Sequence, residues 1–273
     1  MGATAILSPA LLGLLLVGTV VGVLSALLGI GGGLLMVPVL TLWGATPVQA
    51  IASSLVAVVL SSASGTYQNW RMQQLNLERV ALLAPPAMLT TELGVWITTL
   101  LPPGVLLLSF ALLQLLAIFL MNLKQRLQRR HPQTTDQATS SEPRIYRTQG
   151  IGLLAGLLSG LFGVGGGVVM VPLQMLFLEE GIKDAVRTSL GAVTLISIWA
   201  VGRHALAGNV LWLDGLALGI GGLCGAQFGA RLLPKLPDTV VNLLFRSLLL
   251  LLALYMSAKA FIGWGWIPWP WGS

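Results

Sequence analysis

The first 70 residues of this chain contain no charged side chain, and Arg71 is the first one. Over all 273 residues only 9% are charged and 55% are hydrophobic, whereas soluble domains carry about 25% charged residues. Several uncharged stretches reach the ~18 residues that mark a membrane-spanning helix. The pattern predicts an all-α polytopic membrane protein embedded in the lipid bilayer. The first residues offer no Lys or Arg for the basic start of a signal peptide, so we expect no cleaved leader.

The apolar segments predict about eight transmembrane helices in two homologous four-helix repeats. One long polar segment divides the chain, so we expect a first repeat over 1–123, a basic cytoplasmic loop over 124–148 and a second repeat over 149–273. The expected spans are 9–42, 47–67, 80–100, 104–123, 149–178, 185–203, 210–230 and 239–260.

The basic residues predict the orientation in the membrane. Lys and Arg are concentrated in and beside the central loop, from Lys124 to Arg147, and cytoplasmic loops are enriched in these residues. With eight spans, both termini would then also be cytoplasmic, and the tryptophans of the tail over 264–271 would lie at the inner interface. The net charge of +6 therefore reflects membrane topology, and no nucleic-acid partner is expected.

Two glycine-rich blocks occupy matching places in the two halves. The segment GVLSALLGIGGGLLMVP at 22–38 aligns without gaps to GLLSGLFGVGGGVVMVP at 156–172. Internal repeats of this kind are typical of secondary transporters. Four spans in each repeat favour parallel repeats, whereas a re-entrant glycine segment would leave an inverted arrangement open.

The glycine blocks are predicted to interrupt helices. A continuous helix over 9–42 would be about 50 Å long, against a hydrocarbon core of about 30 Å. Irregular backbone at membrane depth must be buried in protein or line a wet cavity. The helix after each break would point its positive end and free amides at that cavity, which favours an anion. Close helix packing on small residues is the alternative explanation.

The duplicated GxGGGxxMVP block and the SSL and TSL segments that follow it resemble the sulfite exporter TauE/SafE family of bacterial membrane permeases. The resemblance covers essentially the whole chain. It implies export of sulfite, thiosulfate or organosulfonates such as sulfoacetate by secondary transport across the bacterial cytoplasmic (inner) membrane. The halves also differ, because Asn69 stands where His204 would align and PPAMLTTELG (85–94) replaces GGLCGAQFGA (221–230). We therefore expect two unequal half-sites.

The substrate is expected between the two breaks, where backbone amides and nearby hydroxyls would hold a small anion without a fixed counter-cation. Bulky side chains at Gly32 or at Gly166 are expected to impair binding more than folding, and in similar ways. The candidate substrate-binding residues are Gly31, Gly32, Gly33, Gly165, Gly166, Gly167, Ser25, Ser159, Ser53, Ser54, Thr188 and Ser189.

Four further residues are candidates for coupling or gating: Glu92, Arg246, His204 and Arg187. Glu92 stands alone in an apolar span, and a carboxylate there is a functional candidate by default. It would either take up protons as the coupling ion or pair with Arg246, which lies at a similar depth. Arg187 would lie at the outer mouth, either as an interfacial arginine or to attract anions. His204 would lie at the inner end of its span as a gate, a cap or an interfacial residue.

Several functions are excluded or kept open. The single cysteine, Cys224, excludes an internal disulfide, and the two histidines lie far apart in sequence, so neither a metal site nor a cofactor is expected. A membrane-embedded enzyme lacks a catalytic constellation. A channel or importer for another small anion, a non-transporting subunit and a homo-oligomer all stay open.

Overall fold

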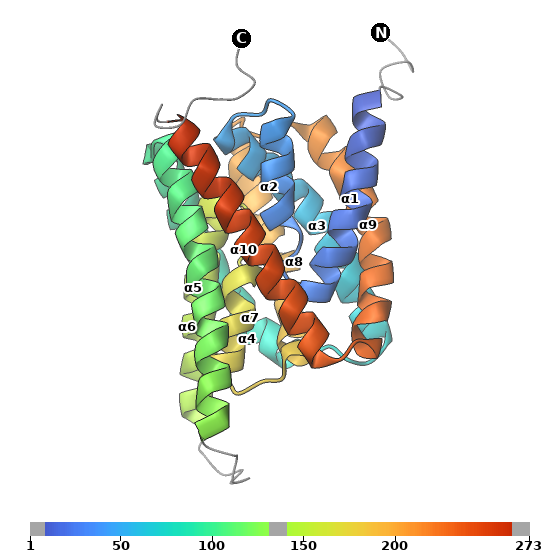
Figure 1. Ribbon diagram of the computed structural model, residues 1–273, viewed down its shortest axis with the longest axis vertical. Coiled ribbons are helices and arrows are strands. Elements are labelled where there is room, and N and C mark those ends of the chain that lie inside the picture. The colour runs from blue at the N-terminus through green and yellow to red at the C-terminus, as the bar shows by residue number, and fades with distance from the viewer. Residues whose placement is uncertain (1–8, 131–140, 264–273) are drawn as a thin grey trace.

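The computed structural model describes residues 9–130 and 141–263, and this part of the chain contains helices and no strand (Figure 1). The predicted all-α class is confirmed. The first half holds α1 (Pro9–Leu28), α2 (Gly33–Leu42), α3 (Pro47–Arg71), α4 (Leu77–Leu100) and α5 (Pro103–Arg130). The second half holds α6 (Ser141–Phe162), α7 (Gly167–Phe177), α8 (Ile182–Leu206), α9 (Trp212–Leu232), the 3-10 turn η1 (Leu233–Lys235) and α10 (Asp238–Gly263). The expected tryptophan-rich tail lies outside the described residues.

The surface of the bundle is that of a multi-pass membrane protein. Large apolar side chains such as Leu16, Leu89 and Leu206 are exposed, which suits contact with lipid. The segments long and apolar enough to cross a membrane are Leu11–Leu28, Pro47–Arg71, Leu77–Leu100, Ile182–Leu206, Trp212–Lys235 and Asp238–Ala260. A shorter apolar segment, Gly104–Phe119, belongs to α5.

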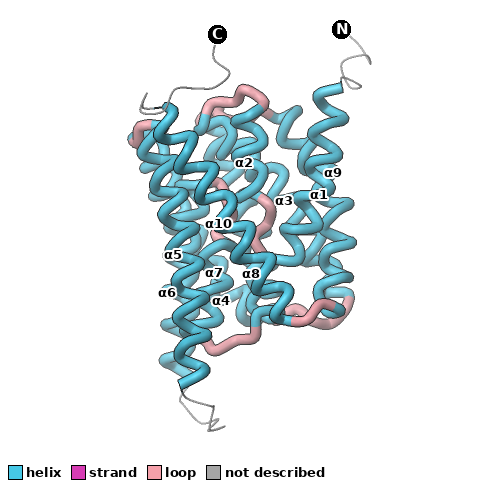
Figure 2. Tube along the Cα trace, viewed as in Figure 1, coloured by secondary structure: helices cyan, strands magenta, loops and turns pink. Residues whose placement is uncertain are grey.

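The glycine blocks turn the chain back on itself (Figure 2). α1 runs into the bundle from the end where Pro9 lies, and after the break α2 returns to that end, where α3 begins. The reversal requires positive φ angles, which are 69° at Gly29, 77° at Gly31 and 92° at Gly32, and glycine adopts these at no steric cost. α6 and α7 form the same hairpin from the other end. The predicted interruption of each helix is confirmed, but counting 9–42 and 149–178 as one membrane crossing each is wrong.

Corresponding helices of the two halves run in opposite directions. Each hairpin is followed by three helices that connect the two ends of the bundle, α3 to α5 and α8 to α10. Because three is an odd number, the second half starts from the end opposite to the first. The expectation of parallel repeats is wrong, since it counted each hairpin as a crossing.

The same geometry separates the central segment from the termini. α5 ends at Arg130 and α6 begins at Ser141, at the end of the bundle opposite to Pro9 and Gly263 (Figure 1). We call the end that holds Arg130 and Ser141 the basic end. The expected arrangement, with the loop and both termini on one side, is incompatible with the structure. The helices also extend into the expected loop, leaving only 131–140 between them.

The two halves interlock through small residues. α1 packs along α9 and α4 along α6, so the first helix of each hairpin lies against the other half. Gly22 lies against the backbone of Gly222 and Gly156 against that of Ala87, too close for any side chain. Such contacts are how helices associate closely in membranes. Close helix packing, the alternative role considered for the glycine blocks, therefore explains these glycines, which lie outside the breaks.

Candidate functional site

The two breaks meet at the centre of the bundle and are fastened by reciprocal hydrogen bonds. The hydroxyl of Ser54 donates to the carbonyl oxygen of Gly163 at 3.1 Å, and that of Ser189 donates to the carbonyl oxygen of Gly29 at 2.9 Å. Each serine comes from the half opposite to the break that it binds. These two candidate residues thus hold the breaks in place, and their hydroxyl protons are already engaged.

The space between the breaks is filled. Gly33 lies against the carbonyl oxygen of Gly163, and Gly167 against that of Gly29. A side chain at Gly31 or Gly165 would collide with valines of α3 and α8, Val58 and Val193. The expected location of the substrate, directly between the breaks, is therefore occupied by protein in this conformation.

The neighbouring hydroxyls of α3 and α8 are also buried. Ser53 accepts a hydrogen bond from the backbone N–H of Leu211 at 2.8 Å, which ties α3 to the start of α9. Thr188 is 2% exposed and precedes Ser189. Of these four predicted hydroxyls, the structure brings those of Ser54 and Ser189 to the breaks, whereas that of Ser53 binds the start of α9.

Two other predicted hydroxyls have no partner. Ser25 in α1 and Ser159 in α6 are 2% and 0% exposed, and neither Oγ makes a hydrogen bond within the described residues. They occupy matching positions, four residues before the first glycine of each break. Buried polar groups are nearly always hydrogen-bonded, so each exception calls for an explanation.

Each break also exposes backbone donors at the start of a helix. α2 and α7 begin directly after a glycine in the left-handed conformation, Gly32 with φ 92° and Gly166 with φ 80°, and no side chain caps either helix. The amides of Leu35 and Met36 bind the carbonyl of Gly32, so the preceding amides have no acceptor within the helix. By contrast, α3 starts at a capping box made by Thr46 and Gln49.

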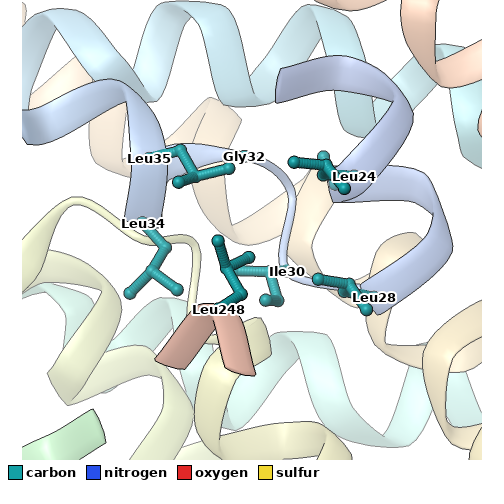
Figure 3. Close-up of a pocket in the computed structure, with 8 residues that line it drawn as sticks. Leu24, Leu28, Ile30, Gly32, Leu34, Leu35 and Leu248 are labelled. Atoms are coloured by element: carbon teal, nitrogen blue, oxygen red, sulfur yellow. The ribbon is translucent and has the colours of Figure 1, made fainter. Parts of the chain in front are cut away.

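Ser25 and Gly32 line one small recess between α1, α2 and α10. Leucines of α1 and α2 converge there with Leu248 of α10 (Figure 3). The recess is too narrow to admit a water molecule. An ion could enter only after the hairpin or α10 moves. The complete lining is Leu24, Ser25, Leu28, Ile30, Gly32, Leu34, Leu35 and Leu248.

Glu92 pairs with α8 instead of α10. One of its carboxylate oxygens lies 2.6 Å from Nε of Arg203, and the other accepts a hydrogen bond from the indole of Trp199 at 3.1 Å. The proposed pair with Arg246 is wrong, because α4 packs against α8 and makes no substantial contact with α10. In Arg246, the buried Nε and Nη2 atoms have no partner in the described part of the chain.

Arg187 and His204 lie at ends opposite to those expected. Arg187 forms an ion pair with Asp184 at 2.9 Å near the start of α8, at the basic end. His204 lies near the far end of α8 and is 0% exposed, so it is buried and not interfacial. The eight-span count misplaced both residues because it reversed the direction of α8.

Sequence reasoning missed two polar side chains in the core. Gln114 in α5 and Gln174 in α7 are both 0% exposed, and neither amide finds a hydrogen-bond partner among the described residues. The signal was available, because each glutamine interrupts a long apolar segment. Gln174 has no polar counterpart in the first half, because the glycine-block alignment matches it to Leu40.

A bundle of membrane-crossing helices with two broken hairpins that meet at its centre has the architecture of a secondary transporter. Residues 14–256 match the family model described as sulfite exporter TauE/SafE, and the chain belongs to that family. The resemblance seen in the glycine blocks is confirmed.

Curated relatives agree with a transport role. The chain is 27% identical to the "Probable membrane transporter protein YunE" of Bacillus subtilis, over 88% of this chain and 94% of the relative. It is 25% identical to the "Probable membrane transporter protein MJ0441" of Methanocaldococcus jannaschii, over 89% of this chain and 94% of the relative. A "Probable membrane transporter protein" of Xylella fastidiosa is 29% identical, over 88% of this chain and 92% of the relative. No solved structure matches the chain at a significant level. This protein is therefore a membrane transporter and not an enzyme.

Proposed function

We propose that the protein exports a small sulfur oxyanion, such as sulfite, thiosulfate or sulfoacetate, across a bacterial cytoplasmic membrane. One observation carries the proposal. In each half, a buried serine, Ser25 or Ser159, precedes an uncapped helix start at a left-handed glycine, and its hydroxyl has no hydrogen-bond partner among the described residues. Hydroxyl and amide donors that converge at a helix N-terminus favour an anion.

The donor set suits a transported ion. Leaving a buried hydroxyl unpaired costs roughly 1–3 kcal/mol, and an anion that accepts its hydrogen bond recovers this cost. Hydroxyls and amides are neutral, so the anion is held without a permanent ion pair. Binding of this moderate strength allows release on the other side, which transport requires.

The opposed halves suggest how access alternates. Each hairpin enters from a different end of the bundle, so a movement of one half against the other would open access to one break at a time. Rocking of opposed halves is the usual mechanism of secondary transporters. The reciprocal bonds of Ser54 and Ser189 would then re-form in every closed state.

The distribution of basic residues supports an orientation that keeps the central segment cytoplasmic, as expected from the sequence, but moves both termini to the other side. Ion pairs between Arg79 and Glu180 and between Lys183 and Asp238 join segments at the basic end. Of the 15 Lys and Arg residues, all but Arg203, Arg246 and Lys259 lie within about two helical turns of that end. By the positive-inside rule the basic end is cytoplasmic, so both termini would lie outside the cytoplasm.

Accessibility tags test this orientation. A tag inserted at Gln137 is expected to be reachable only from the cytoplasm, whereas tags at the N- and C-termini should be labelled on intact cells. A terminal tag that reacts only after the membrane is permeabilised would contradict the proposed orientation.

A panel of anions tests the substrate class. Ligands that bind only the folded state raise its stability, so sulfite, thiosulfate or sulfoacetate should raise the melting temperature of the purified protein more than acetate or chloride. Trans-stimulated exchange in proteoliposomes would then separate a carrier from a channel. Equal melting shifts for every anion would count against the proposal. Export over import rests on the family description alone.

A further inference from the structure

Asn69 and His204 are buried polar side chains at matching positions in the two halves. Both are 0% exposed. Their backbone carbonyls are used alike, since Asn69 accepts from the N–H of Gln74 at 3.0 Å and His204 from that of Asn209 at 3.1 Å. Neither polar atom of the Asn69 side chain has a partner in the described part of the chain. The imidazole of His204 lies beside the backbone of Gly160 but makes no well-formed hydrogen bond among the described residues.

The two side chains lie toward opposite ends of the bundle. Asn69 is near the end of α3, at the basic end, and His204 is near the end of α8, at the end that holds both termini (Figure 1). With the orientation proposed above, Asn69 belongs to the cytoplasmic half of the transport path and His204 to the outer half. Of this matched pair, only His204, in the outer half, has a side chain that can change its charge.

Few charged groups surround His204. α4 contributes Glu92, which is already bound by Arg203 and Trp199. The stretches of α1, α3, α6 and α7 away from the basic end carry no charged residue. The remaining charged residues toward this end are Asp214 at the start of α9 and Lys259 near the end of α10, whereas Arg246 lies in the half of α10 nearer the basic end.

The last turn of α6 provides acceptors close to His204. The hydroxyl of Thr98 donates to the carbonyl oxygens of Gly160 and Leu161 at 3.2 and 3.0 Å. A helix C-terminus carries partial negative charge and stabilises a nearby cation. The end of α6 can thus stabilise the positive charge of a protonated His204 imidazole, and no carboxylate besides Glu92 is needed.

We propose that His204 is the proton-binding group of the outer half of the transport path. When this half opens, one proton passes from water on the outer side to an imidazole nitrogen, and the added positive charge retains the anion there. Asn69 offers a polar but non-titratable group in the cytoplasmic half. This matched pair therefore makes transport sensitive to protons on the outer side only. This inference rests on the proposed transport function.

The test measures transport against the pH on each side separately. Right-side-out membrane vesicles are given thiosulfate, whose charge is constant over the range of about pH 5 to 8 in which histidine titrates. For the wild type, the KM for outer thiosulfate is expected to fall severalfold as the outer pH is lowered, and to respond little to the inner pH. In His204→Asn this dependence is expected to disappear.

Two further variants keep the test decisive. Asparagine already occupies the matching position in the first half, so His204→Asn is expected to fold, and Asn69→His is expected to add a response to the inner pH. Glu92→Gln is the control, and its KM for outer thiosulfate should still fall when the outer pH is lowered. The role of His204 is overturned if His204→Asn keeps the wild-type pH response, if Glu92→Gln abolishes it, or if the wild type shows none. A wild type that moves neither thiosulfate nor sulfite contradicts the proposed function itself.

Discussion

Alanine at Gly166 is expected to destabilise the protein by about 3 kcal/mol or more, and alanine at Gly32 by only about 1–2 kcal/mol. Both glycines have positive φ angles, 80° and 92°, so both changes introduce backbone strain. A Cβ at Gly166 would lie 2.5 Å from the carbonyl oxygen of Ala155, which is rigid helix backbone. At Gly32 the nearest atom is Cε of Met36 at 3.0 Å, the tip of a flexible side chain.

Melting temperatures of the two variants in detergent measure this difference. Gly44→Ala isolates the effect of the φ angle, because Gly44 has φ 97° and no atom near its Cβ position. Gly32→Ala should resemble this control, whereas Gly166→Ala should melt many degrees lower. Equal losses at Gly32 and Gly166 would contradict the argument. The sequence-based expectation was that valine at the two positions has similar, though not identical, effects, because the breaks form a matching pair.

Features that depend on neighbouring residues in the chain could be predicted from the sequence. The two helix breaks, the membrane class and the family all follow from glycine patterns and from uncharged segments, and these were confirmed. The return of the chain after each break was not predictable in the same way. A 34-residue apolar segment with a central break fits a broken span as well as a hairpin. The packing of α2 on α3 and of α7 on α8 decides between them, and that packing is not local.

This one ambiguity accounts for the wrong topology. Counting a hairpin as a crossing reverses every helix that follows it, so α8 was assigned the opposite direction. Arg187 was then placed at the outer mouth and His204 at the inner end. The same count placed Lys183, Arg187, Arg231 and Lys235 on the side away from the central loop, whereas the structure places all four toward the basic end.

The serine hydroxyls of the site also depend on contacts that local sequence does not reveal. Ser54 and Ser189 repeat at matching positions, as Ser25 and Ser159 do, and the sequence cannot tell the two pairs apart. Ser54 finds its acceptor in Gly163, 109 residues away. Glu92 was likewise assigned a partner by depth alone, because the sequence does not say which helix α4 faces.

Replacing Ser25 or Ser159 by alanine is expected to weaken anion binding about tenfold to a hundredfold, and to leave the melting temperature of the free protein unchanged or raised. A hydrogen bond to a charged group contributes about 1.5–3 kcal/mol, which is one to two factors of ten in affinity. Neither hydroxyl has a partner in the described part of the free protein, so its removal breaks no bond and relieves a buried unpaired group.

Ser54→Ala and Ser189→Ala provide the matched controls. Their hydroxyls donate to the carbonyl oxygens of Gly163 and Gly29. Each change should therefore lower the free energy of unfolding by about 1 kcal/mol for each hydrogen bond lost, and with it the melting temperature. Measuring melting temperature and thiosulfate affinity on all four variants separates the two roles. If Ser25→Ala and Ser159→Ala bind the anion as tightly as the wild type, the unpaired hydroxyls do not hold the substrate, and another set of buried donors, such as the amides of Gln114 and Gln174, would have to do so.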